Sequence, residues 1–254
     1  MHKQKFDELL QIMYKLRNEC SWDKEQTFDS IKASTIEEAY EVVEAIDNKD
    51  YNELKNELGD LLLHVIFHSV MAEEKELFTI NEVIDSIKDK LIRRHPHVFE
   101  NLKVKDNKEI ENNWEKIKMQ EGRESLLEGI PKALPQLQSA ARMQEKVSKI
   151  GFDWENKEDV WEKVIEEIDE LKKAEQLDDK EEIENELGDI FFSLVNYSRF
   201  LGVNPENALR RTNTKFRKRF NYIEEQLKKN GSSITNTNLE EMDKYWEESK
   251  KYFN

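Results

Sequence analysis

Carboxylate side chains recur in this chain at a spacing that could hold divalent metal ions. Four pairs share it: Glu38 with Glu41, Glu57 with Asp60, Glu167 with Glu170, and Glu186 with Asp189. Residues three apart lie on one face of a helix, so the members of each pair project together. Two facing pairs would repel each other and resist burial unless a cation joined them. Oxygen-only ligands favour Mg²⁺, or Mn²⁺ as a substitute, over Zn²⁺, and protein-bound Mg²⁺ is commonly shared with substrate phosphates.

The acidic pattern occurs twice in register. Glu57 follows Glu38 by 57 − 38 = 19 residues, and Glu186 follows Glu167 by 186 − 167 = 19 residues, at an offset of 167 − 38 = 129. The sequence Asn-Glu-Leu-Gly-Asp appears at both 56–60 and 185–189. We therefore expect a duplicated domain, with one copy over residues 1–125 and the other over 126–254. The segment 126–135, which contains one Gly and two Pro, is the predicted linker.

An all-α fold is predicted from composition and from apolar residues at helical spacing. The chain has 7 Gly and 4 Pro, where average usage would supply roughly 18 and 13. No alternating strand pattern persists. Expected helices cover about 5–17, 27–47, 51–75, 80–94, 136–149, 158–176, 180–201 and 205–229, with loops at 20–27 and 151–154. Two tandem helical domains follow, with sites that a partner subunit could complete.

The helix expected at 51–75 carries a narrow polar stripe on an otherwise apolar surface. The stripe contains Glu53, Glu57, Asp60, His64 and His68. A helix that is apolar nearly all round is buried, so we expect the stripe to face a site inside the protein. The preceding helix, with Glu38 and Glu41, is less decisive, because its acidic face could equally be solvated.

Basic and aromatic residues could complete the chemistry. The run from Lys215 to Arg219 is densely cationic, and Lys90 to Arg94 resembles it. Such side chains could hold phosphates, or they could instead complement the dipole at a helix end. Trp114 and Trp246 could stack on a nucleobase, although a single Trp in a helical protein is more often part of the core. We assign His95 and His97 a structural role.

Charge and hydropathy exclude several functions. A net charge of −15 argues against sequence-independent nucleic-acid binding, which requires many Lys and Arg. The longest apolar run, 61–67, is far shorter than the ~20 residues of a membrane span. The only cysteine, Cys20, allows no internal disulfide, and the N-terminal residues lead into an amphipathic helix rather than a secretion signal. We expect a cytoplasmic protein with neither nucleic-acid nor membrane partners.

Together these motifs resemble the MazG family of nucleoside triphosphate pyrophosphohydrolases, in its two-domain bacterial form. The resemblance covers nearly the whole chain. It rests on Cys-Ser-Trp-Asp-Lys-Glu-Gln-Thr at 20–27, the doubled acidic signature, Arg-Arg-His-Pro-His-Val-Phe at 93–99, Gly-Phe-Asp-Trp at 151–154 and the cationic run at 215–219. It implies an all-α homodimer that uses Mg²⁺ to cleave a nucleoside triphosphate between its α and β phosphates. The products would be the monophosphate and pyrophosphate.

The resemblance also assigns residues to roles. It implies metal ligands at Glu38, Glu41, Glu57 and Asp60 in the first copy, and at Glu167, Glu170, Glu186 and Asp189 in the second, where they form the catalytic set. It implies substrate contacts from Lys163, Lys215, Arg219 and Trp246. Which glutamate acts as general base stays open, as does the physiological nucleotide.

The two copies are not equivalent. Lys163 corresponds to Ser34, and Ser193 and Asn196 correspond to His64 and Phe67. Because the first copy lacks one cation that could bind phosphate, we expect the C-terminal site to be the main catalytic site.

Two other functions compete with this interpretation. A related all-α enzyme could be specific for dUTP or for phosphoribosyl-ATP. A non-enzymatic helical interaction protein would instead carry scattered, solvent-facing carboxylates.

Overall fold

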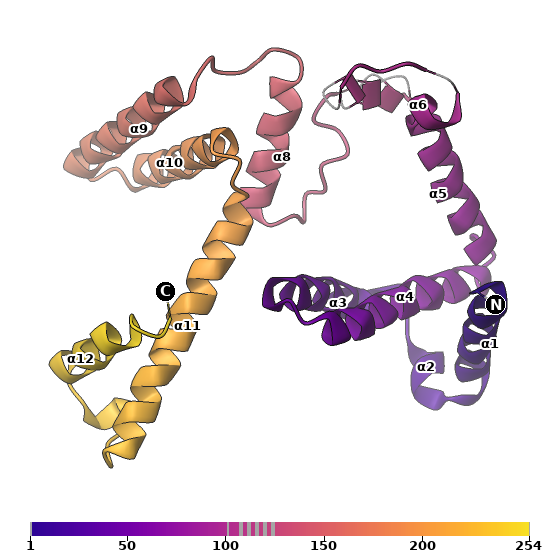
Figure 1. Cartoon of the computed structure of the whole chain (residues 1–254), viewed down its shortest axis with the longest axis horizontal. Coiled ribbons are helices and arrows are strands. Elements are labelled where there is room, and N and C mark those ends of the chain that lie inside the picture. The colour runs from indigo at the N-terminus through magenta and orange to yellow at the C-terminus, as the bar shows by residue number, and fades with distance from the viewer. Residues whose placement is uncertain are drawn as a thin grey trace. The chain divides into compact units, whose positions relative to one another are not determined.

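The computed structural model describes residues 2–100, 102–106, 109–110, 113–114, 117–118, 121–122 and 125–253 (Figure 1). The described residues form helices, turns and irregular segments and contain no strand, which confirms the all-α prediction. The chain divides into two compact units, residues 1–114 and 115–254. The boundary expected at 125/126 stays a prediction.

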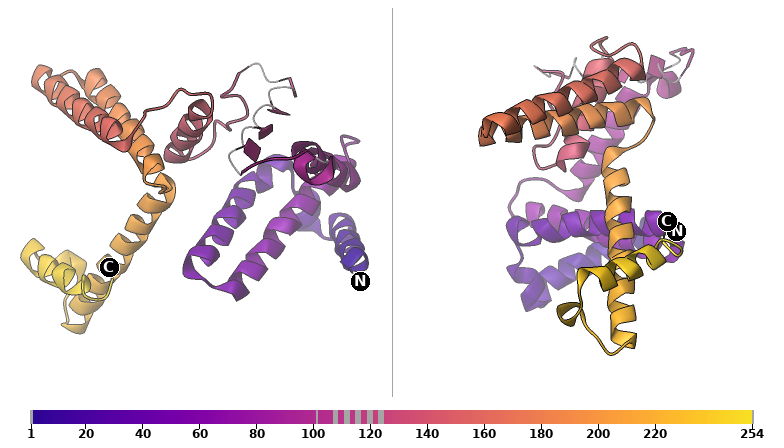
Figure 2. Two further views of the ribbon diagram at one scale, coloured as in Figure 1. Left: turned by 45° about the horizontal axis from the view of Figure 1, so that its top comes forward. Right: turned by 90° about the vertical axis from the view of Figure 1, so that its left-hand side faces the viewer.

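The N-terminal unit is built around a helical hairpin. Its helices are α1 (His2–Glu19), α2 (Ser21–Glu25), α3 (Phe28–Asn48), α4 (Tyr51–Glu73), α5 (Ile80–Arg94) and α6 (Pro96–Phe99). Helices α3 and α4 lie side by side and carry the first acidic pattern (Figure 2). The turn between them has a clear local cause. Lys49 ends α3 in the left-handed conformation, and the Asp50 side chain then accepts hydrogen bonds from the first backbone N–H groups of α4.

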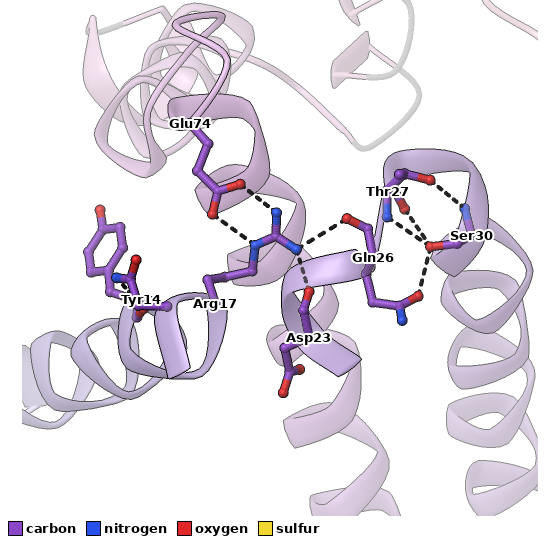
Figure 3. Close-up of polar contacts among 8 residues, drawn as sticks. Tyr14, Arg17, Asp23, Gln26, Thr27, Ser30 and Glu74 are labelled. Carbon is purple, nitrogen blue, oxygen red and sulfur yellow. Dashed lines mark hydrogen bonds and ion pairs between the residues drawn. The ribbon is translucent and has the colours of Figure 1, made fainter. Parts of the chain in front are cut away.

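One apolar core joins α1, α3 and α4. It contains Met13, Ile31, Ile66, Phe67, Val70 and Met71. Beside it, the buried guanidinium of Arg17 forms an ion pair with Glu74 and donates to the backbone carbonyls of Asp23 and Gln26 (Figure 3). Thr27 and Ser30 then close a capping box at the start of α3. These contacts fix the segment that leads into the helix carrying Glu38 and Glu41.

The C-terminal unit repeats the hairpin. Its helices are α8 (Gln136–Ser148), α9 (Lys157–Leu177), α10 (Lys180–Phe200), α11 (Pro205–Lys229), the 3₁₀ turn η1 (Ile234–Asn236) and α12 (Leu239–Ser249). Asp178 ends α9 in the left-handed conformation and Asp179 caps α10, as Lys49 and Asp50 do in the first unit. Helix α8 packs on α10, and a separate core lies between α11 and α12.

Three helices, α2, α6 and the C-terminal α12, were not predicted from the sequence. The expected loop at 20–27 contains α2, and the chain turns into α6 directly after α5, with Pro96 in the first turn, where its missing N–H is not needed. No helix was predicted over 239–249, where α12 lies. Periodicity over the five residues of α2 or the four of α6 is too short to identify a helix.

The expectation that the α4 helix is buried all round is wrong for a single chain. Its C-terminal half, from His64 to Ala72, is mostly buried. In its N-terminal half, however, Leu58 and Leu62 are 51% and 39% exposed. The stripe with Glu57 therefore lies beside an apolar surface that the described residues of the N-terminal unit leave exposed. Among the described residues, no helix combines the length and apolar character needed to cross a membrane.

Candidate functional site

The C-terminal hairpin gathers three predicted metal ligands. Glu167 on α9 and Glu186 and Asp189 on α10 each offer a carboxylate oxygen, and these oxygens lie within 4.8 Å of one another. Glu167 is 6% exposed, Glu186 is half-buried and Asp189 is exposed, so the set extends from the interior of the hairpin to its surface. The donor set consists only of oxygen atoms, as a hard divalent cation requires.

Glu186 carries the observation that best fits a cation. Its Oε2 atom is buried and has no hydrogen-bond partner. Burial raises the pKa of Glu186, and the neighbouring charges of Glu170, Glu182, Glu167 and Asp189 raise it further. A buried carboxylate surrounded by like charges is unfavourable unless a positive ion joins the group. The residues therefore fit Mg²⁺ or Mn²⁺.

Lys163 supplies a fixed cation beside this set. Its Nζ atom lies 2.7 Å from Oε1 of Glu167 and 3.1 Å from Oε1 of Glu166, each within one helical turn. The hydrogen bond to Glu167 is the main reason why the pKa of Lys163 is raised. Lys163 therefore stays protonated at the edge of the carboxylate cluster, where it can also meet an anionic ligand.

The N-terminal hairpin gathers a similar set. Oxygens of Glu38, Glu41 and Glu57 lie within 4.8 Å of one another. Burial raises the pKa of Glu57 to about 7, with contributions from its hydrogen bond to Glu53 and from the charge of Glu41. The pKa of Glu38 is also raised, first by burial and then by the charges of Glu41 and Asp60.

The two carboxylate sets have different neighbours, as predicted from the replacement of Lys163 by Ser34 in the first copy. Instead of a lysine, the N-terminal set has His64, whose Nε2 lies 3.9 Å from Oε1 of Glu38. The other ring nitrogen of His64 and Nε2 of His68 both contact the Thr35 hydroxyl, at 2.9 and 3.0 Å. Burial lowers the pKa of both histidines, so this network is neutral where the C-terminal unit has a positive charge.

Two predicted ligands lie outside these close sets. Asp60 is not one of the three N-terminal residues whose oxygens meet, and Glu170 is not one of the three C-terminal ones. Each is near enough for its charge to raise the pKa of a ligand, Glu38 and Glu186 respectively. Their role as direct ligands stays a prediction.

The other predicted substrate contacts form a separate group. The guanidinium of Arg219 lies 5.4 Å from the centre of the Trp246 ring, which packs on Phe216, and Arg219 Nε donates to the carbonyl of Phe253 at 2.8 Å. Lys215 lies one turn earlier on α11. Among the described residues, no hydrogen bond or ion pair joins Lys215, Arg219 or Trp246 to Glu167, Glu186 or Asp189.

Sequence reasoning missed a cavity of about 620 Å³ that opens beside the C-terminal set. Lys163, Glu167 and Asp189 line one part of it, and apolar and aromatic side chains line most of the rest. Gln144 on α8 also lines it and is 5% exposed. The Gly-Phe-Asp-Trp motif at 151–154 was the one available signal, because all four of its residues line the cavity.

Comparison with known protein families identifies the family of this chain. Residues 26–99 and 155–223 match the MazG nucleotide pyrophosphohydrolase domain, and these segments include both hairpins. The chain belongs to the MazG family. It is 46% identical over 250 residues to the nucleoside triphosphate pyrophosphohydrolase/pyrophosphatase MazG of Thermotoga maritima, a match that covers 96% of this chain and 95% of that protein. It is 41% identical over 254 residues to the nucleoside triphosphate pyrophosphohydrolase of Escherichia coli, at 96% and 97% coverage.

The match confirms the predicted family and the prediction of a pyrophosphohydrolase enzyme. The family segments contain all eight predicted metal ligands, together with Lys163, Lys215 and Arg219, whereas Trp246 lies beyond them. The alternative of a non-enzymatic protein required scattered carboxylates in solvent. The buried, convergent positions of Glu57 and Glu167 contradict it.

Proposed function

We propose that this MazG-family chain hydrolyses nucleoside triphosphates between the α and β phosphates, with Mg²⁺ as cofactor, mainly at the C-terminal site. The observation that carries the proposal is the convergence of Glu167, Glu186 and Asp189 beside Lys163, with Oε2 of Glu186 buried and unpartnered. The names of the Thermotoga maritima and Escherichia coli relatives support this substrate class. The products are the monophosphate and pyrophosphate, and the role is cleansing or regulation of the nucleotide pool.

Each residue of the site has a separate task in this proposal. Glu167, Glu186 and Asp189 hold Mg²⁺, which would neutralise phosphate charge and act as a Lewis acid. Lys163 binds phosphate oxygens and thereby positions the α phosphorus for in-line attack by water. A carboxylate oxygen of the set that does not bind the metal accepts the proton of that water.

The test is the identity of the products with a panel of ordinary and damaged nucleoside triphosphates and Mg²⁺ or Mn²⁺. We expect monophosphate and pyrophosphate in equal amounts, and no diphosphate. The variant E186Q should lose turnover, whereas E175Q, an exposed position on α9, is the matched control and should keep it. Failure to release pyrophosphate from any substrate would disprove the proposal. A strong preference for dUTP or phosphoribosyl-ATP would support the related enzymes instead.

We also propose that the active form is a homodimer, in which a second copy brings its cationic group to the site. Apolar side chains on the hairpins support this: Tyr40, Leu58, Phe191 and Phe192 are all 45% or more exposed. No described hydrogen bond or ion pair joins Lys215 or Arg219 to the carboxylate set of the same chain, so in this proposal a second copy supplies their phosphate contacts. The predicted cytoplasmic location stays a prediction.

Mixing two inactive variants tests the dimer. E167Q lacks a metal ligand, and the double variant K215A/R219A lacks the cationic group. If each site combines groups from two chains, refolding the variants together should restore up to about a quarter of wild-type turnover by statistical pairing, because mixed dimers contain one complete site. Light scattering should give twice the chain mass. A monomer, or the absence of complementation, would count against the shared site.

A further inference from the structure

The cavity beside the C-terminal carboxylates is lined in part by residues whose counterparts in the N-terminal unit are buried in its apolar core. Three of its lining residues, Val160, Asn196 and Arg199, correspond at the offset of 129 to Ile31, Phe67 and Val70 (160 − 31 = 196 − 67 = 199 − 70). Those three N-terminal residues are buried in the apolar core. Corresponding positions of the duplicated hairpin thus belong to an apolar core in one unit and line a cavity in the other.

Gln144 lines this cavity and carries an unsatisfied hydrogen-bond acceptor. Its Nε2 donates to the backbone carbonyl of Phe192 at 2.8 Å, and its Oε1 is buried without a partner. A carbonyl can only accept, so this bond fixes which end of the amide is nitrogen and which is oxygen. A buried acceptor without a hydrogen bond is unfavourable, and Gln144 is only 5% exposed. The acceptor therefore indicates a ligand with a hydrogen-bond donor, such as an N–H group.

The other polar groups of the cavity are held in place. Arg199 donates to Asp153 through both terminal nitrogens, and its Nε and Nη2 donate to Oδ1 of Asn196 at 3.1 and 2.9 Å. The Asn196 oxygen is thereby occupied, which leaves its NH₂ group as a donor for a ligand. Apolar walls with a few fixed polar groups are typical of small-molecule pockets. Phe152 and Trp154, 77% and 45% exposed, stand among the lining residues.

We propose that this cavity is the nucleobase pocket of the C-terminal site and that Oε1 of Gln144 accepts a hydrogen bond from an N–H of the base. This inference rests on the proposed function, because the phosphates would lie at Lys163, Glu167 and Asp189, which line the same cavity. Each ordinary base presents at least one such N–H, on an exocyclic amino group or a ring nitrogen. A single acceptor consequently holds every ordinary base and predicts broad base specificity.

The decisive experiment compares two non-hydrolysable ligands in calorimetry with Mg²⁺. One is α,β-methylene-ATP, and the other is its analogue with unsubstituted purine, which has no N–H on the base. Wild type should bind the ATP analogue about tenfold more tightly, and Q144M should bind the two equally. The control Q136M lies at an exposed position on the same helix, where the side-chain amide also donates to a backbone carbonyl. It should keep the wild-type ratio.

Two results would overturn the pocket: a wild-type ratio near one, or a ratio that survives in Q144M. A failure of the proposed function is distinct, since it would appear as no pyrophosphate release by wild type. If Q144M does not fold, N196F provides the second test, because it introduces the larger side chain of the N-terminal unit. N196F should weaken α,β-methylene-ATP binding at least tenfold and leave binding of inorganic tripolyphosphate unchanged. Equal loss of both ligands, or of neither, would contradict the pocket.

Discussion

The two units of this chain share one helical hairpin but differ in what fills it. In the N-terminal unit, Phe67 lies in a closed apolar core beneath Arg17, whose guanidinium lies 5.6 Å from the ring centre. In the C-terminal unit, Asn196 takes that position and lines a cavity beside Lys163. The close carboxylate sets share two corresponding members, Glu38 with Glu167 and Glu57 with Glu186. The difference teaches that the acidic pattern marks where a cation could bind, whereas the residues behind it determine whether a larger ligand also fits.

The largest expected effect separates the two acidic sets. The pair of substitutions E167Q/E170Q should reduce turnover by at least about 10²-fold, since a catalytic metal supplies several kcal/mol of transition-state stabilisation. The matched pair E38Q/E41Q should reduce it much less. Steady-state pyrophosphate release measures both. If the N-terminal pair abolished turnover and the C-terminal pair left it intact, the ranking of the two sites would be reversed.

A second comparison exchanges the side chains of Phe67 and Asn196 between the two hairpins. F67N places an amide in the packed N-terminal core and should reduce the free energy of unfolding by about 3–5 kcal/mol, the range for removing a buried aromatic ring. N196F fills a cavity instead and should change stability far less. Urea denaturation followed by circular dichroism compares them. A similar loss in both variants would mean that the C-terminal hairpin is as tightly packed as the other.

The cation that distinguishes the sites can also be exchanged. K163S introduces the N-terminal residue and should lower kcat/KM by about tenfold to a hundredfold, because it removes a charged hydrogen-bond donor from the phosphates. S34K is the converse substitution and should increase the affinity of the N-terminal unit for tripolyphosphate. Unchanged kcat/KM in K163S would show that Lys163 serves only to balance the charge of Glu166 and Glu167.

The smallest expected effect is a pH dependence of stability without metal. The raised pKa of Glu57, about 7 against an ordinary 4.5, means that the folded chain holds a proton that the unfolded chain releases between these values. Stability of the metal-free protein should therefore fall as pH rises from about 4.5 to about 7. Urea denaturation in EDTA measures this slope, and E57Q should flatten it. A slope that E57Q does not change would assign the effect elsewhere, for instance to Glu186, whose pKa is also raised.

Much of the fold could be predicted because its signals are local. Apolar spacing located the long helices, and the repeated Asn-Glu-Leu-Gly-Asp segments identified the duplication. The same signals brought Glu38 together with Glu57, and Glu167 with Glu186, because a hairpin of two helices is enough to do so. Short α2 and α6 fell below the length at which periodicity is informative.

The rest of the site depends on packing between distant segments. The cavity exists because α8 supplies Gln144 while α10 supplies Asn196 rather than a large apolar side chain, and neither residue belongs to a recognisable catalytic pattern. The sequence comparison of Phe67 with Asn196 noted the difference without showing that it opens a space. The predicted phosphate contacts of Lys215 and Arg219 stay a prediction, because no described contact joins these residues to the carboxylate set.

The contacts of Arg17 have a consequence for how the N-terminal unit opens. One buried guanidinium joins α1 to the end of α4 through Glu74 and to the α2 segment through the carbonyls of Asp23 and Gln26 (Figure 3). These parts cannot separate one at a time without leaving a buried charge unpaired. They should therefore unfold as one cooperative unit, and the backbone amides of α2 should exchange with deuterium as slowly as those at the end of α4.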